Sequence, residues 1–252
     1  MSKQPDDDRG TTHFGFRRVA EADKAALVNG VFDSVAPRYD LMNDLMSLGV
    51  HRLWKGAMMD WLGPRAGMTL IDVGGGTGDV AFRFLERGGG SVTVVDVNEE
   101  MLNLGRDRAI DKGVIKGIRW LPGDAEALPI EDGSFDAYTA AFSLRNVTRL
   151  KHALTEARRV LKPGGRFLCL EFSQVAFPLL DKLYEAYSFK ILPALGERVA
   201  GDREAYQYLA ESIRRFPAQD AFARMIGAVG LGQVKVRNLS GGIAALHSAW
   251  RI

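Results

Sequence analysis

The sequence has little cysteine, little net charge and no long apolar run, and each shortage excludes a class of protein. Cys169 is the only cysteine among 252 residues, so neither an intrachain disulfide nor a cysteine metal site can form. The 33 basic and 31 acidic side chains leave a formal net charge of +2, which gives no electrostatic argument for nucleic-acid binding. No apolar run reaches the ~18 residues that span a bilayer, and no spacing of His, Cys or carboxylates indicates a metal site.

The first residues also lack a basic stretch followed by an apolar core, which a signal peptide would need. Their polar, acidic composition predicts a disordered tail over residues 1–18. We therefore expect a cytoplasmic protein whose contact with a membrane is at most peripheral.

Apolar runs alternate with helical patterns between Met68 and Phe172, which is typical of a parallel sheet covered on both faces. Asn98, followed by two glutamates, is a good N-cap for one of the helices, and further helices are expected from about Thr148 and near Ala218–Val229. The pattern predicts an α/β, Rossmann-like fold with a seven-stranded sheet. The expected strands are Thr69–Val73, Ser91–Asp96, Ile118–Leu121, Phe135–Phe142, Arg166–Phe172, Gln233–Asn238 and Ile243–Trp250.

A glycine-rich turn, Gly74-Gly-Gly-Thr-Gly78, follows the first expected strand and leads into a helix. Such a turn presents backbone N–H groups to a ligand. Gly74 and Gly76 fit the G-x-G-x-x-G motif of dinucleotide-binding folds, but Asp79 stands where the third glycine would be. A carboxylate at the mouth of the turn would repel a pyrophosphate, so the motif favours S-adenosylmethionine, which carries an ammonium and a sulfonium. A nicotinamide dinucleotide is the alternative, and a glycine turn without any ligand is a weaker one.

Polar residues follow the carboxyl ends of successive expected strands, where open α/β sheets bind ligands. Asp72 and Gly74 would hold the methionine end of the donor, and Asp96 would accept hydrogen bonds from both ribose hydroxyls. Asp124 would accept from the adenine amino group, with the backbone of Ala125 against the ring. The segment Ser143-Leu-Arg-Asn146 is expected at the same edge.

The chain reads as one domain over residues 19–252. We expect a helical cap over residues 19–66, a cofactor-binding core over 67–173, a lid and helix insertion over 174–232, and terminal strands over 233–252. The cap is dense in methionine and aromatics, and Phe177–Val199 holds more apolar residues than one helix face can bury.

Two long stretches carry a specific resemblance: Tyr39–Lys55, and Arg145-Asn-Val-Thr148 followed by Ala153–Gly165. Both resemble the signature sequences of the UbiE/COQ5 family, the C-methyltransferases of ubiquinone and menaquinone biosynthesis. The similarity extends over nearly everything after about residue 30 and includes Asp124–Asp136, Tyr184–Ala200, Tyr206–Ile213 and Ala245–His247.

The resemblance implies a class I methyltransferase with an N-terminal helical cap and a lid inserted after the fifth strand. It implies S-adenosylmethionine-dependent C-methylation of a polyprenyl benzoquinol, a demethylmenaquinol, or both. Thr77, Asp96, Asp124 and Ala125 fall at cofactor positions. Ser143 stands where relatives have a glycine, and Ala141 where they have a serine, which leaves open whether Ser143 contacts the cofactor.

C-methylation needs a phenol that loses its proton, so that its ortho carbon can attack the methyl group in a dry site. Arg145 is our candidate to stabilise the phenolate, directly or through an ordered water, with Asn146 to orient it. The alternative for Arg145 is an ordinary salt bridge near a helix start. Other polar and aromatic residues are weaker candidates, and each has a structural alternative: His51, His247, Tyr39, Asp40, Asn43, Tyr184, Tyr187, Tyr206 and Tyr208.

The expected partners follow from this chemistry. They are the polyprenyl quinol, a membrane surface reached through the lid, other quinone-biosynthesis enzymes and a second copy in a homodimer, but no nucleic acid. Two other functions stay open, a nicotinamide-dependent oxidoreductase and a non-catalytic assembly subunit of quinone biosynthesis.

Overall fold

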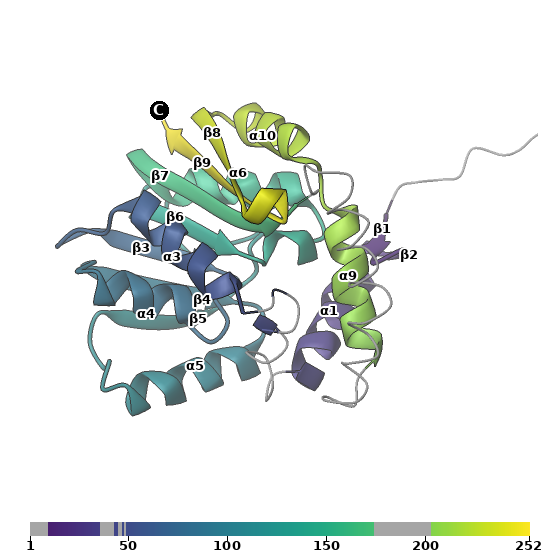
Figure 1. The fold of residues 1–252 in the computed structure, drawn as a ribbon, viewed down its shortest axis with the longest axis horizontal. Helices are drawn as coiled ribbons and strands as arrows, with labels where there is room; N and C mark the ends of the chain where they lie inside the picture. Colours follow the sequence, from purple (N-terminus) through teal and green to yellow (C-terminus); the bar gives the residue numbers. More distant parts are fainter. Residues whose placement is uncertain (1–9, 36–42, 45–46, 48, 174–202) are drawn as a thin grey trace, which may run out of the picture.

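Seven strands form the central sheet of the computed structural model, which describes residues 10–35, 43–44, 47, 49–173 and 203–252 (Figure 1). The strand order is β5-β4-β3-β6-β7-β9-β8, with the first five strands parallel and β9 antiparallel to both neighbours. The predicted strands are confirmed, and only β7 begins well before its predicted start. The strands are β3 Thr69–Val73, β4 Ser91–Asp96, β5 Ile118–Pro122, β6 Phe135–Ala141, β7 Leu161–Phe172, β8 Leu231–Leu239 and β9 Ala244–Arg251.

Helices cover both faces of the sheet because successive strand residues point to opposite sides and both sides are apolar. Leu70 and Val94 belong to a core shared with α3 (His51–Leu62), α4 (Asp79–Glu86) and α5 (Glu99–Asp111). Ile71 and Val73 belong to a second core, shared with α6 (Leu150–Val160) and α10 (Gln219–Ala228). The predicted N-cap is confirmed, since Asn98 Oδ1 accepts a hydrogen bond from Met101 N at 3.0 Å.

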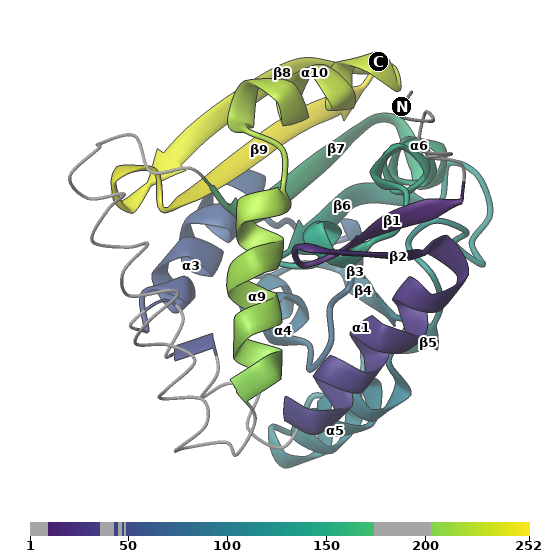
Figure 2. The same ribbon diagram turned by 90° about the vertical axis from the view of Figure 1, so that its right-hand side faces the viewer.

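The N-terminal part differs from the predicted tail over residues 1–18. Strands β1 (Thr11–Phe14) and β2 (Arg17–Ala20) pair as an antiparallel hairpin beside α1 (Glu21–Val35) and α9 (Arg203–Arg215), as Figure 2 shows. The hairpin is ordered because Phe14 is buried and its ring stacks on Tyr208, with centroids 4.1 Å apart. This contact joins residues 194 positions apart, so the local polarity of the N-terminus does not predict it.

Several predicted features lie outside the described residues, drawn in grey in Figure 1. They include residues 174–202 of the insertion expected over residues 174–232, with Tyr184 and Tyr187, and also Tyr39 and Asp40 of the cap. Within the described ranges, no helix is long and apolar enough to cross a membrane. Those ranges also contain no group of three His, Cys, Asp or Glu side chains placed to hold a metal ion.

Candidate active site

A pocket opens at the carboxyl ends of β3, β4 and β6, where the strand order reverses. With its open mouth it holds about 860 Å³ of space. Helix α1 contributes Ala25, Val28 and Phe32 to one wall. The remaining lining residues are Val73, Gly74, Gly76, Asp96, Val97, Asn98, Met101, Gly123, Asp124, Ala125, Glu126, Phe142, Ser143, Asn146, Val147 and Thr148. Seven of the predicted site residues therefore line one pocket, whereas Asp72, Thr77 and Arg145 do not.

The turn after β3 requires glycine for both conformation and space. Gly74 and Gly76 have φ values of +65° and +51°, in the left-handed region that disfavours side chains. A Cβ on Gly74 would lie 2.2 Å from Ser143 Cβ, so the turn packs directly against the segment that follows β6. Ser143 Oγ also donates to Val73 O at 2.9 Å, which holds the two segments together.

Asp96 ends β4 and lines the pocket with a carboxylate that the backbone already orients. Its Oδ2 accepts from Gly76 N at 2.8 Å and its Oδ1 accepts from Asn98 N at 2.9 Å. Burial raises the pKa of Asp96 to about 6, although the surrounding backbone N–H groups oppose the shift. Each oxygen keeps a further lone pair for a ligand hydroxyl.

Asp72 lies beneath the glycine turn instead of in the pocket wall. Its Oδ1 accepts from Thr139 Oγ1 at 2.8 Å, while Oδ2 is buried without a hydrogen-bond partner among the described residues. A Cβ on Gly75 would lie 2.7 Å from this oxygen, so the carboxylate lies directly against the backbone of the turn and leaves no space for a side chain there. Burial raises the pKa of Asp72 to about 7.

Asp79 does not face the pocket, contrary to the argument that its charge would meet the ligand. Its carboxylate binds Lys55 Nζ at 2.9 Å and Arg83 Nε at 3.0 Å. Burial opposes ionisation, but these two cations hold the pKa of Asp79 below its ordinary value. Asp79, the residue that departs from the dinucleotide motif, therefore connects the cap helix α3 to the start of α4 through Lys55.

Thr77 is also turned away from the pocket. It is buried, and its Oγ1 accepts a hydrogen bond from Arg108 Nη1 at 3.0 Å. This contact joins the glycine turn to α5.

The loop after β5 brings Asp124 and Ala125 to the pocket. Asp124 Oδ1 accepts from Glu126 N at 2.8 Å, a local turn that shapes the loop. Glu126 was not predicted; its carboxylate accepts from the backbone N–H groups of Thr148 and Arg149, which ties this loop to the opposite wall.

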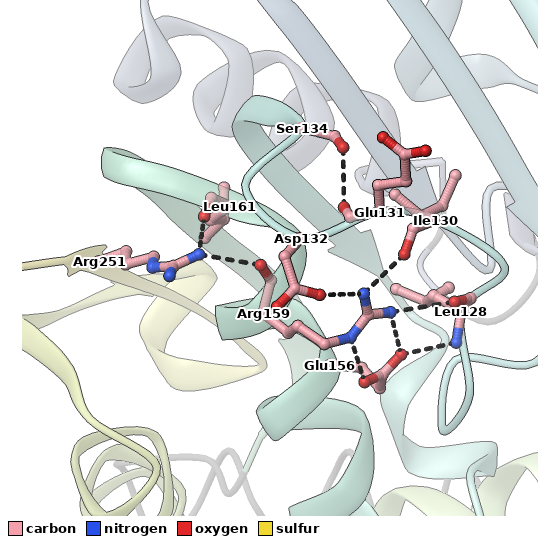
Figure 3. A network of polar contacts seen from close by, with 9 residues as sticks. All are labelled: Leu128, Ile130, Glu131, Asp132, Ser134, Glu156, Arg159, Leu161 and Arg251. Atoms are coloured by element: carbon pink, nitrogen blue, oxygen red, sulfur yellow. Dashed lines mark hydrogen bonds and ion pairs between the residues drawn. The ribbon is translucent and has the colours of Figure 1, made fainter.

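Arg159 of α6 anchors the far part of the same loop (Figure 3). Its guanidinium donates to the carbonyl oxygens of Leu128 and Ile130 at 3.0 and 2.6 Å. It also binds the carboxylates of Glu156 and Asp132. A sequence pattern gives no signal for this anchor, because the two carbonyl groups that Arg159 binds belong to residues 31 and 29 positions earlier in the chain.

Arg145 is buried and does not line the pocket, which argues against a direct contact between its side chain and a phenolate; a contact through an ordered water stays a prediction. The side chain is 2% exposed, and Nη1 donates to Glu171 Oε2 at 3.0 Å and to the carbonyl oxygen of Phe142. Its guanidinium carbon lies 5.7 Å from the centre of the Phe172 ring. The alternative prediction, a salt bridge, describes the residue, because the short helix η2 (Leu144–Asn146) turns its side chain inward.

Asn146, at the end of η2, faces the pocket. Its Oδ1 accepts from the hydroxyl of Tyr208 at 3.0 Å, which leaves the amide N–H groups as the donors toward the pocket. Burial raises the pKa of Tyr208 above its ordinary value, so that side chain stays a neutral hydroxyl.

Neither histidine considered from the sequence lines the pocket. His51 is buried, with Nε2 3.0 Å from Asp44 Oδ1, and burial lowers its pKa. His247 is buried against Phe222, with Nε2 3.2 Å from Gln219 O. Both positions agree with the structural alternative given for these residues.

The pocket has the chemistry that adenosine and a methionine tail require. Asp96 and Asp124 supply acceptors, Val97, Met101 and Phe142 supply apolar contacts, and Gly74 and Gly76 bring bare backbone to the pocket. The buried, unpartnered oxygen of Asp72 beneath the turn is an acceptor available to an ammonium group, whose positive charge would favour the ionised carboxylate. Among the described residues that line the pocket there is no lysine or arginine to receive a pyrophosphate. The residues present therefore fit S-adenosylmethionine.

The strand order, in which the antiparallel strand β9 lies between β7 and β8, is that of class I methyltransferases. Together with this pocket it defines the chain as a class I S-adenosylmethionine-dependent methyltransferase. Solved structures share the fold. A Thermotoga maritima methyltransferase described as a possible histamine N-methyltransferase superposes with a TM-score of 0.64, at 22% identity over 88% of this chain and 99% of that one. A geranyl diphosphate C-methyltransferase from Streptomyces coelicolor, solved with S-adenosyl-L-homocysteine, superposes with a TM-score of 0.57, at 17% identity over 79% of each chain.

Within this class, the chain belongs to the ubiE/COQ5 methyltransferase family, which matches residues 17–251. A protein of Paracoccus denitrificans named ubiquinone/menaquinone biosynthesis C-methyltransferase is 60% identical over 98% of this chain and 99% of its own length. A protein of Brucella abortus with the same name is 56% identical over 95% of this chain and 90% of its own length. The predicted family, fold class and methyl donor are confirmed.

Proposed function

We propose that this enzyme transfers the methyl group of S-adenosylmethionine to a ring carbon of a polyprenyl quinol, in the synthesis of ubiquinone, menaquinone or both. The observation that carries the proposal is the full-length identity of 56–60% to relatives named for this reaction. The pocket supports it, because Ala25, Val28 and Phe32 of α1 give the pocket that holds the donor residues an apolar wall suited to an aromatic acceptor.

The donor residues divide by position. Asp96 would accept from the ribose hydroxyls, Asp124 from the adenine amino group, and the backbone of Ala125 would lie against the ring. The N–H groups near Gly74 and Gly76, with Asp72 beneath them, would hold the methionine end. When bound, S-adenosylmethionine supplies an electrophilic methyl group on a sulfonium.

For the acceptor, the roles predicted for Arg145 and Asn146 are exchanged. Asn146 would donate an amide N–H to the quinol oxygen and so stabilise its ionised form. Arg145, through Glu171 and the Phe142 carbonyl, would fix the η2 turn that presents Asn146. Val28, Phe32 and Phe142 would exclude water, which favours a displacement in which opposite charges cancel.

The remaining predicted partners are also proposals. The substrate's tail lies in a bilayer, so we expect transient peripheral contact with the membrane. A homodimer and contacts with other quinone-biosynthesis enzymes are expected on the resemblance alone.

Expression of the chain in cells that lack their own quinone C-methylase tests the function. We expect the methyl group to return to the quinones of these cells, and mass spectrometry shows whether benzoquinones, naphthoquinones or both recover it. Calorimetry supplies the counter-test, because tight binding of NAD(P)H without binding of S-adenosylhomocysteine would indicate an oxidoreductase. Donor binding without methyl transfer to any quinol would indicate a non-catalytic assembly subunit.

A further inference from the structure

The tip of the β1–β2 hairpin, residues Phe14–Arg18, presents an aromatic ring among cations. Phe16 is 50% exposed, although it is a large apolar side chain. The Arg215 guanidinium carbon lies 5.8 Å from the centre of its ring, and that of Arg17 lies 5.1 Å from the Phe14 ring. Arg17, Arg18 and Arg215 are exposed.

The tip is held rigidly on α9 by Glu211. Phe16 N donates to Glu211 Oε2 at 2.9 Å, and Gln207 Nε2 donates to the other oxygen at 2.8 Å. A Cβ on Gly15 would lie 2.2 Å from Glu211 Oε2, so only glycine allows this close approach. The exposed ring of Phe16 is therefore already ordered, and a surface that binds it need not first order a loop.

The tip is also connected to the active site through two side chains. Phe14 stacks on Tyr208 with an interplanar angle of 16°, and the Tyr208 hydroxyl donates to Asn146, which lines the pocket. A second hollow, next to the tip, is lined in part by Phe14, Phe16, Leu27, Val31 and Tyr208. Figure 2 shows the hairpin lying beside α1 and α9.

We propose that the hairpin tip docks on the surface of an anionic lipid bilayer. Phe16 enters the boundary between headgroups and acyl chains, and Arg17, Arg18 and Arg215 pair with lipid phosphates. Glu204 and Glu211 line the hollow beside the tip, and both oxygens of Glu211 accept hydrogen bonds from the protein. The three arginines outnumber these two acids, so the described groups at the tip keep a positive balance. The inference rests on the proposed function, because a polyprenyl tail keeps the substrate in the bilayer.

Co-sedimentation with vesicles tests the proposal. The full chain is mixed with vesicles of phosphatidylcholine alone, or of phosphatidylcholine with phosphatidylglycerol, and the bound fraction is measured. We expect stronger binding to the anionic vesicles, a loss of about tenfold in partition for Phe16→Glu, and a loss of about fivefold for Arg18→Gln.

Ile115→Glu is the matched control, because Ile115 is 75% exposed and lies in the loop before β5. It should bind anionic vesicles as the unmodified chain does. Equal binding by Phe16→Glu, or no preference of the unmodified chain for anionic vesicles, would overturn the proposal. A change of oligomeric state in Phe16→Glu with vesicle binding intact would also overturn it, in favour of a second copy at the tip.

Methylation assays separate this inference from the proposed function. Phe16→Glu should methylate a water-soluble, short-tailed quinol at the unmodified rate but lose rate on a long-tailed quinol presented in vesicles. Failure of the unmodified chain to methylate either quinol would count against the proposed function. The vesicle measurement tests membrane docking of the hairpin tip and does not depend on methyl transfer.

Discussion

Replacing Asp96 by alanine gives the sharpest prediction about the donor site. The backbone N–H groups of Gly76 and Asn98 each occupy one carboxylate oxygen, at 2.8 and 2.9 Å. A carboxylate offers about four acceptor positions, so two remain for the two ribose hydroxyls. Loss of two charge-assisted hydrogen bonds should weaken donor binding by about 2–4 kcal/mol, which is about 30- to 1000-fold in Kd.

Calorimetric titration with S-adenosylhomocysteine measures this change. Asp136→Ala is the matched control, because Asp136 also accepts a backbone hydrogen bond, from Thr69 N at 2.8 Å, but lies at the amino end of β6, away from the pocket. The control should bind as the unmodified chain does, even if it melts at a lower temperature. Unchanged affinity in Asp96→Ala, or an equal loss in both variants, would refute the assignment of Asp96 to the ribose.

Three further predictions concern the same site. Arg145→Met should lower the free energy of unfolding by about 3–5 kcal/mol in urea, because it leaves Glu171 buried without its cation, and adding Glu171→Leu should recover part of the loss; equal stability of the single and double variants would contradict the buried pair. Asn146→Ala should reduce kcat at least about tenfold while the Kd for S-adenosylhomocysteine is unchanged, and a matching loss of donor affinity would contradict its placement at the acceptor. Donor affinity should rise with pH between about 6 and 7, where Asp96 and then Asp72 ionise, and level off above that range. The sign is opposite for the unliganded fold: the raised pKa of Asp96 contributes stability that is complete below its unfolded value of 3.8 and is lost as the pH rises through about 6. An affinity that does not change between about pH 5 and 7, or the same pH dependence in Asp96→Ala, would contradict this reasoning.

Local sequence patterns predicted the sheet and the edge of the sheet at which the methyl donor binds. The β3 and β4 strands are buried on both faces, and their apolar runs end at Gly74 and Asp96, which line the pocket. The glycine turn and Asp96 lie within one βαβ unit, and their contact follows from the fold class alone.

The contacts that local patterns do not predict join segments far apart in sequence. Arg145 is next to the pocket residue Asn146 in the chain's segment after β6, but Glu171, 26 residues later, binds its side chain in the core. Asp79 faces Lys55 of the cap and not the ligand, so the correct donor was predicted for a partly wrong reason. Phe14 is ordered by Tyr208, and no local feature of an acidic N-terminus predicts that partner.

The central claim is methyl transfer to a quinol ring carbon, and one assay tests it directly. The purified chain is incubated with S-adenosylmethionine carrying a ¹³C methyl group and with demethylated benzoquinol and naphthoquinol, and the products are examined by NMR. We expect a new labelled methyl group on a ring carbon, formed at least about tenfold more slowly by Asn146→Ala. Label on a quinol oxygen, or no transfer despite binding of S-adenosylhomocysteine, would contradict it.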